Sequence, residues 1–147
     1  MTLLSQLLWG SVFLTICAIL HVVAIAMLID HLSRLALALS HRGRFVRISM
    51  VVGAAFGMIT VSHTIQVWIW AKAFILMGVI EDLNTSLYFA LVTYSTVGYG
   101  DVTLGPGSRI FGTFAGVSGV LTLGVSTAIL VALLGRLLAN LHHTDQK

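Results

Sequence analysis

STVGYGD, residues 95–101, is the stretch of this 147-residue chain that decides its fold. Gly98 and Gly100 lack a Cβ atom, so their backbone can adopt angles that turn successive carbonyl groups toward one axis. The hydroxyl of Thr96 adds a further oxygen at one end of the run. The pattern predicts a loop at residues 96–100 whose oxygens are neutral and numerous enough to replace the water around a weakly bound cation.

The composition places the chain in a membrane. Hydrophobic residues make up 58% of it and charged residues only 9%, whereas a soluble domain carries about 25% charged residues. The net charge of +3 is small and scattered, so no nucleic-acid partner is expected. Cys17 is the only cysteine, which excludes an internal disulfide and a cysteine metal cluster. The sequence contains no catalytic triad pattern or phosphate-binding loop, so an enzyme is not expected.

Three stretches are long enough to cross a membrane as helices, which takes about 20 apolar residues. They cover about residues 7–29, 46–76 and 110–138. The first has no Lys or Arg in its opening residues and is longer than the apolar part of a signal peptide, so we expect it to be retained. A fourth apolar stretch, 87–95, is too short to cross and leads directly into the 96–100 loop. We therefore expect a short helix that enters the membrane and returns, surrounded by protein or by a wet cavity. Its candidate N-cap residues are Asp82, Asn84 and Thr85.

Basic residues lie mainly on one side of the expected spans. Four arginines occur between residues 34 and 47, in the connection between the first two spans, whereas the opposite side has only Lys72 and Arg109. The positive-inside rule then places this connection and the C-terminus in the cytoplasm. The N-terminus and the 96–100 loop lie outside, in a multi-pass protein of the cell membrane, either plasma or inner. The default role of the four arginines is topological, with anionic lipid headgroups as the alternative.

Residues 48–138 resemble the pore module of the potassium-channel superfamily, especially its small prokaryotic members. The similarity is carried by residues 87–95, by the TVGYG run with the following acid, and by Gly119 and Gly124 in the third span. It implies an all-α membrane protein with three transmembrane helices, a re-entrant pore helix and a selectivity-filter loop. It further implies a homotetramer around a central pore that conducts K+ passively and selectively. No cofactor is implied, since K+ is the permeant ion.

The resemblance divides the chain into three parts. Residues 48–138 would form the pore domain of outer helix, pore helix, filter and inner helix. Residues 1–47 lie outside the likeness and are expected to form one additional N-terminal transmembrane helix and a cytoplasmic basic loop. Residues 139–147 are expected to form a short cytoplasmic tail.

The resemblance also assigns roles to individual residues around the filter. Asp101 would lie at the outer mouth, where it either raises the local cation concentration or accepts hydrogen bonds for the loop, and both roles stay open. Many relatives carry two tryptophans, whose N–H groups tether the filter, where this chain has Tyr88 and Phe89, and Phe89 cannot donate a hydrogen bond. Some relatives carry a carboxylate where this chain has Val92, so filter stability is expected to differ while conduction is retained. The filter residues are Thr96, Val97, Gly98, Tyr99 and Gly100, of which the first four would bind K+. The supporting residues are Tyr88, Phe89, Val92 and Ser95.

The third span holds candidates for gating. Gly119 lies where the family carries an inner-helix hinge, and Gly124 is a second candidate. Small residues also let membrane helices pack closely, so hinge and packing roles both stay open for Gly119. Thr127 is expected by the resemblance to face the central cavity. No span carries arginine at every third position, so a voltage sensor is not expected.

His21 and His63 lie within expected spans, where ionisable residues are functional candidates. Counted along the helices from the basic connection, His63 falls in the outer half of the membrane and His21 nearer the inner surface. We therefore expect that the two imidazoles do not pair and that each bonds to another neighbour in its neutral form.

Two other classes of function are considered beside a channel. A potassium transporter subunit usually holds four divergent loops in one chain, whereas this chain has a single loop with the whole signature. A non-conducting membrane scaffold or regulatory subunit would have no need of an intact TVGYG run. The expected partners are other copies of the chain in a homotetramer and membrane lipids, and a separate regulatory subunit stays open.

Overall fold

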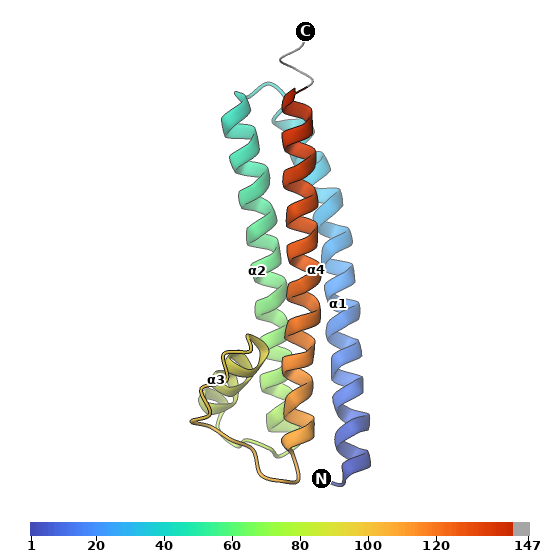
Figure 1. The fold of residues 1–147 in the computed structure, drawn as a ribbon, viewed down its shortest axis with the longest axis vertical. Helices are drawn as coiled ribbons and strands as arrows, with labels where there is room; N and C mark the ends of the chain where they lie inside the picture. Colours follow the sequence, from blue (N-terminus) through green and yellow to red (C-terminus); the bar gives the residue numbers. More distant parts are fainter. Residues whose placement is uncertain (143–147) are drawn as a thin grey trace.

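Three long helices run side by side, and a short one lies against one end of them (Figure 1). The structure is a computed structural model that describes residues 1–142, with side chains described for residues 1–137. Over these residues the chain is all-helical and contains no strand. The helices are α1 (Leu3–Ala38), α2 (Arg44–Leu76), α3 (Leu83–Tyr94) and α4 (Arg109–His142). α1, α2 and α4 are each long and apolar enough to cross a membrane, which confirms the predicted all-α fold with three candidate spans.

The long helices extend beyond the apolar stretches that predicted them. They contain 36, 33 and 34 residues, or about 50 Å each at 1.5 Å per residue, against about 30 Å of hydrocarbon core. Only residues 39–43 separate α1 from α2, so most of the predicted basic loop is helical. α4 likewise continues through residues 139–142 of the predicted tail, and residues 143–147 lie outside the described part of the chain.

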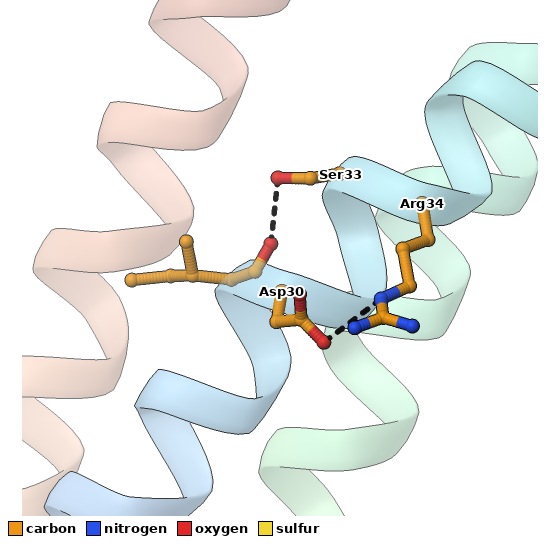
Figure 2. A network of polar contacts seen from close by, with 4 residues as sticks. Asp30, Ser33 and Arg34 are labelled. Carbon is orange, nitrogen blue, oxygen red and sulfur yellow. Dashed lines mark hydrogen bonds and ion pairs between the residues drawn. The ribbon is translucent and has the colours of Figure 1, made fainter.

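Two local contacts lie on α1 at the end of its apolar stretch. Figure 2 shows the Nε of Arg34 3.0 Å from Oδ2 of Asp30, one helical turn earlier, and the hydroxyl of Ser33 donating to the carbonyl oxygen of Ile29 at 2.8 Å. Both ion-pair side chains are largely exposed. An exposed pair at this spacing adds a few tenths of a kcal/mol to a helix, which suits a surface turn but holds nothing else in place.

An aromatic cluster joins all four helices near the end that carries α3. The ring of Phe74 on α2 packs edge-on against Phe89 of α3 at 5.1 Å and Phe111 of α4 at 5.7 Å between centroids. Phe13 of α1 lies 5.9 Å from the fully buried Trp70. Because edge-to-face aromatic pairs bury large areas in fixed orientations, this cluster sets the position of α3 against the bundle.

α1 packs along α4 over much of its length. Its buried residues recur at alternating intervals of four and seven, the spacing that keeps one helix face against a neighbour. At the end near α3, Oε1 of the buried Gln6 accepts hydrogen bonds from the backbone N–H groups of Ile110 (3.1 Å) and Phe111 (3.3 Å). These are among the N–H groups at a helix start that lack a partner within their own helix. α1 therefore caps the helix that follows the TVGYG loop. The buried residues of α1 are Gln6, Gly10, Cys17, His21, Leu28 and Leu32.

Candidate functional site

The start of α3 is fixed by a cap and by a bond to α2. Of the three candidate N-cap residues, Asp82 holds the position: its Oδ2 accepts from the backbone N–H of Thr85 at 2.8 Å and from the Thr85 hydroxyl at 2.9 Å. The backbone bond from Thr85, the larger effect, holds the pKa of the Asp82 carboxyl below its usual value. The hydroxyl of the buried Ser86 donates to the carbonyl oxygen of Ala71 on α2 at 2.7 Å. α3 therefore begins at a defined place on α2.

The end of α3 is fixed by its closest neighbour on α4. A Cβ added at Gly119 would lie 1.8 Å from the carbonyl oxygen of Tyr94, the last residue of α3. Only glycine allows two backbones to approach so closely. Gly119 therefore has a packing role, and its role as a hinge stays a prediction.

Two further α4 candidates lie on the exposed side of that helix. A Cβ at Gly124 would meet no atom within 4 Å. The exposed Thr127 donates its hydroxyl to the carbonyl oxygen of Leu123 on its own helix at 2.9 Å. The proposed hinge at Gly124 and the cavity position of Thr127 both stay predictions.

The 96–100 loop has a backbone that alternates in handedness. Thr96, Gly98 and Gly100 have φ angles of 62°, 57° and 78°, so every second residue lies in the left-handed region. In an ordinary strand every residue has negative φ, so the positive φ at every second residue separates this loop from a strand. The conformation is easy for glycine and costs about 1–2 kcal/mol at Thr96. The loop is held to α3 by the N–H of Gly98, which donates to the carbonyl of Val92 at 3.2 Å.

Most of this loop has no cover within one chain. All residues from 95 to 101 are exposed, and the side chains of Val97 and Tyr99 are 53% and 73% exposed. The hydroxyl of Ser95 bonds back to the carbonyls of Leu91 at 2.7 Å and Val92 at 3.4 Å on α3. Among the described residues, no group of three or more His, Cys, Asp or Glu side chains is placed to hold a metal ion.

A direct bond ties α3 to the residue that follows the loop. The phenol of Tyr88 donates to Oδ2 of Asp101 at 2.5 Å, and the N–H of Val102 donates to its Oδ1 at 3.1 Å. The bond from Tyr88 holds the pKa of the Asp101 carboxyl below its usual value and raises the pKa of the Tyr88 phenol. Asp101 therefore accepts hydrogen bonds behind the loop, and Tyr88 supplies the tether that Phe89 cannot. The ring of Phe89 packs in the aromatic cluster.

The prediction that His21 and His63 lie at different depths is wrong, whereas the prediction that each imidazole bonds to another neighbour is confirmed. Their ring centroids lie 5.2 Å apart, and the hydroxyl of Ser126 on α4 lies 3.2 Å from Nε2 of His21 and 3.0 Å from Nε2 of His63. The error came from the helix ends. α1 continues to residue 38 and α2 begins at residue 44, which puts both imidazoles about 25–29 Å from those ends at 1.5 Å per residue.

Four polar residues around these imidazoles were missed as a set. Polar positions spaced three or four residues apart within otherwise apolar helices are the signal that identifies such a group. On α2 the spacing joins Ser62 to Gln66, and on α4 it joins Thr122 to Ser126. All four residues are buried.

Comparison with known proteins identifies one related family. A family model described as an ion channel matches residues 50–136, more than half of the chain. The matched part contains most of α2, all of α3, the 96–100 loop and most of α4, whereas α1 lies outside it. No curated protein and no solved structure matches significantly.

Proposed function

The chain belongs to the ion channel family matched at residues 50–136, and from this premise we propose that it is a potassium-selective channel that conducts K+ passively as a homotetramer. Membership makes it an ion channel of the membrane and not an enzyme. The selectivity, the assembly and the orientation are proposed on the grounds below.

The observation that carries the proposal is the backbone of the TVGYG loop. Its alternating φ angles favour carbonyl groups that face one side, and a K+ filter needs such a column of carbonyl oxygens to replace the hydration shell. The oxygens would come from Thr96, Val97, Gly98 and Tyr99, with Gly100 closing the column. Smaller or more strongly hydrated ions gain less from neutral oxygens at this spacing.

A homotetramer follows from how little of an ion one loop can surround. Filters of this kind are rings of four loops, and closed cyclic assemblies are the usual way to build a ring from one chain. The exposure of Val97 and of Tyr99 supports neighbouring subunits at the loop. In such a ring α3 would act as the pore helix, its negative C-terminal end directed at the axis, where it stabilises a partly hydrated cation.

The proposed orientation puts the loop at the outer face. It rests on the arginines between residues 34 and 47, which favour a cytoplasmic position for that end of the bundle. Asp101 would then lie at the outer mouth, where four copies attract cations in addition to the bond each accepts from Tyr88.

Flux from liposomes tests the proposal directly. Purified full-length protein is reconstituted with a K+ gradient or a Na+ gradient, and we expect K+ to move much faster than Na+. Gly98→Ala forces a Cβ onto a residue with φ of 57° and should abolish the selectivity. Gly53→Ala, at a helical position where a Cβ meets no atom within 4 Å, is the matched control. Equal K+ and Na+ rates in the unmodified protein would overturn the proposal.

The assembly is tested separately by the mass of the detergent-solubilised protein. We expect a particle of four chains, about four times 15.8 kDa. A particle that is not a multiple of four chains would overturn the tetrameric pore whatever the flux result.

A further inference from the structure

A continuous chain of hydrogen bonds crosses the bundle and ends at α3. It starts on α2, passes to α1, returns through α4 to α2, and reaches the last residue of α3 before it terminates on α4. Its interior members on α1 and α4 are buried. In order, the groups are Gln66, His21, Ser126, His63, Tyr94, Thr122 and the carbonyl of Ser118.

The direction of the bonds can be worked out from the α4 end. The Thr122 hydroxyl lies 2.8 Å from the carbonyl oxygen of Ser118, which can only accept, so Thr122 donates. Thr122 must then accept from the phenol of Tyr94 at 2.7 Å. The single phenol proton is used there, so the Tyr94 oxygen accepts from Nδ1–H of His63 at 2.8 Å.

The same reasoning carries through both imidazoles. A neutral His63 that donates from Nδ1 accepts at Nε2, from the Ser126 hydroxyl at 3.0 Å. Ser126 in turn accepts from Nε2–H of His21 at 3.2 Å. Nδ1 of His21 is left as an acceptor, for the side-chain N–H of Gln66 at 3.1 Å.

The other end of the chain gives the same direction independently. Nε2 of Gln66 lies 3.3 Å from the backbone carbonyl oxygen of Ser62. A reversed amide would set two oxygens against each other, so the nitrogen faces both Ser62 and His21 and donates to each. The two ends therefore agree on one proton order, in which His21 carries its proton on Nε2 and His63 on Nδ1.

An added proton changes this order and costs one of its bonds. A charged imidazole donates from both nitrogens. If His63 gains a proton at Nε2, the bonds from His63 to Ser126 and from Ser126 to His21 reverse. Nδ1–H of His21 then faces the N–H of Gln66. If His21 itself gains the proton at Nδ1, this N–H likewise faces the N–H of Gln66. Nδ1–H of His21 then donates to the Ser62 hydroxyl, 3.3 Å away, and the bond from Gln66 is lost.

No nearby charge offsets that conflict. The titratable groups that face the imidazoles are each other, Tyr94 from α3, and Cys17 one turn before His21 on α1. α2 and α4 otherwise present amide and hydroxyl groups. Within the described residues no hydrogen bond or ion pair joins either imidazole to a carboxylate, a lysine or an arginine. A groove of about 410 Å³ reaches His63.

We propose that His21 and His63 are positioning residues for the selectivity filter: together with Ser126 they hold Tyr94, two residues before the filter loop, by a hydrogen-bond chain that is complete only while both imidazoles are neutral. This rests on the proposed function for the role of the loop. Tyr94 is the point of action because its phenol is held by the chain and its carbonyl oxygen lies against Gly119. α1 thereby acts on the filter through side chains that the matched family region does not include.

Nitrogen NMR of the full chain in lipid bilayers tests the proton order without any flux measurement. With ¹⁵N-labelled histidine at neutral pH, we expect opposite tautomers: protonated Nε2 in His21 and protonated Nδ1 in His63. Variants His21→Gln and His63→Gln assign the two signals among the six histidines. Identical tautomers, or a doubly protonated ring at neutral pH, would overturn the chain.

Flux tests the positioning role. Ser126→Ala keeps both imidazoles but removes the bridge, and should lower the K+/Na+ flux ratio about fivefold, the factor that one net hydrogen bond represents. In the unmodified protein acidification should lower the same ratio, and in Ser126→Ala it should have little further effect. Ser126→Thr restores a hydroxyl and should restore the ratio. Thr64→Val removes a hydroxyl that bonds only to its own helix and is the control.

The outcomes separate the two proposals. An unchanged ratio and an unchanged pH profile in Ser126→Ala would overturn the positioning role while the unmodified protein still selects K+. If the unmodified protein does not select K+, the proposed function fails, and the NMR result still decides whether the proton order exists.

Discussion

Replacing Gly119 with alanine distinguishes a packing role of this glycine from a role as a hinge. The added Cβ would lie 1.8 Å from the carbonyl oxygen of Tyr94 and 2.7 Å from its carbonyl carbon. Both neighbours are backbone atoms at the end of α3, so no side-chain rotation relieves the contact. α3 and α4 must move apart close to the start of the 96–100 loop.

The magnitude follows from that geometry. Contacts of a real Cβ almost never fall below 3.0 Å, so the two backbones must separate by at least about 1.2 Å at a site with little free space. Overpacking of this kind costs about 1–3 kcal/mol. Alanine recovers about 1 kcal/mol because it favours a helix over glycine. We take the upper part of the range because the obstacle is backbone, which leaves a net loss of about 2 kcal/mol per chain.

Two measurements on the purified protein check this value. Denaturant unfolding should show Gly119→Ala less stable than the unmodified protein. Liposome flux should show a reduced K+/Na+ ratio because the 96–100 loop, the proposed filter, has shifted. Gly135→Ala is the matched control on α4, since a Cβ there meets no atom within 4 Å and should raise stability slightly.

If Gly119 acts only as a hinge, the two measurements should give the opposite result. Alanine would then stiffen α4, leave or raise the stability, keep the K+/Na+ ratio, and change only the fraction of time the pore is open. That result would refute the packing role of Gly119 and the placement of Tyr94 against it.

Three further changes test the contacts that hold the loop and its flanking helices. Tyr88→Phe removes the bond that lowers the pKa of Asp101. A lowered carboxyl pKa stabilises the folded state at pH above the usual carboxyl pKa, and this gain disappears as the pH falls through the lowered pKa. The acid-side loss of flux should therefore move to higher pH in Tyr88→Phe, and an unmoved profile would contradict the bond between Tyr88 and Asp101. Gln6→Leu leaves two N–H groups at the start of α4 without their acceptor and should cost about 1–3 kcal/mol in denaturant unfolding, whereas unchanged stability would show that α1 does not cap α4. Asp82→Ala removes the N-cap of α3 and should lower the thermal unfolding temperature more than Asp82→Asn, which keeps an accepting oxygen; equal effects would argue against the cap.

The architecture follows from features that a sequence displays locally. A run of about 20 apolar residues forms a helix in a membrane wherever it occurs, because its backbone polar groups have no other partner. The short 87–95 stretch and the glycines of TVGYG similarly predict a short helix followed by an irregular loop, and the structure has α3 and then a loop with positive φ at Gly98 and Gly100. The same residues carried the resemblance to a channel pore, and the family match agrees at the level of an ion channel.

The contacts between helices could not be predicted from the sequence. The depth of His21 relative to His63 depended on where α1 and α2 end, and those ends lie outside the apolar stretches. Gln6 and Ile110 lie 104 positions apart, so nothing local connects the amide to the helix start that it caps. The tether from Tyr88 to Asp101 likewise needed the position of the chain after the loop.

By itself, then, the sequence determined that this protein is a bundle of membrane-length helices with a short helix and a glycine-containing loop, because hydropathy and backbone freedom are properties of consecutive residues. Only the tertiary structure decided that Gly119 is pressed against Tyr94, and that two histidines from different helices share one serine. Those contacts depend on distances through space between helices, and such distances are set by the packing of the whole bundle.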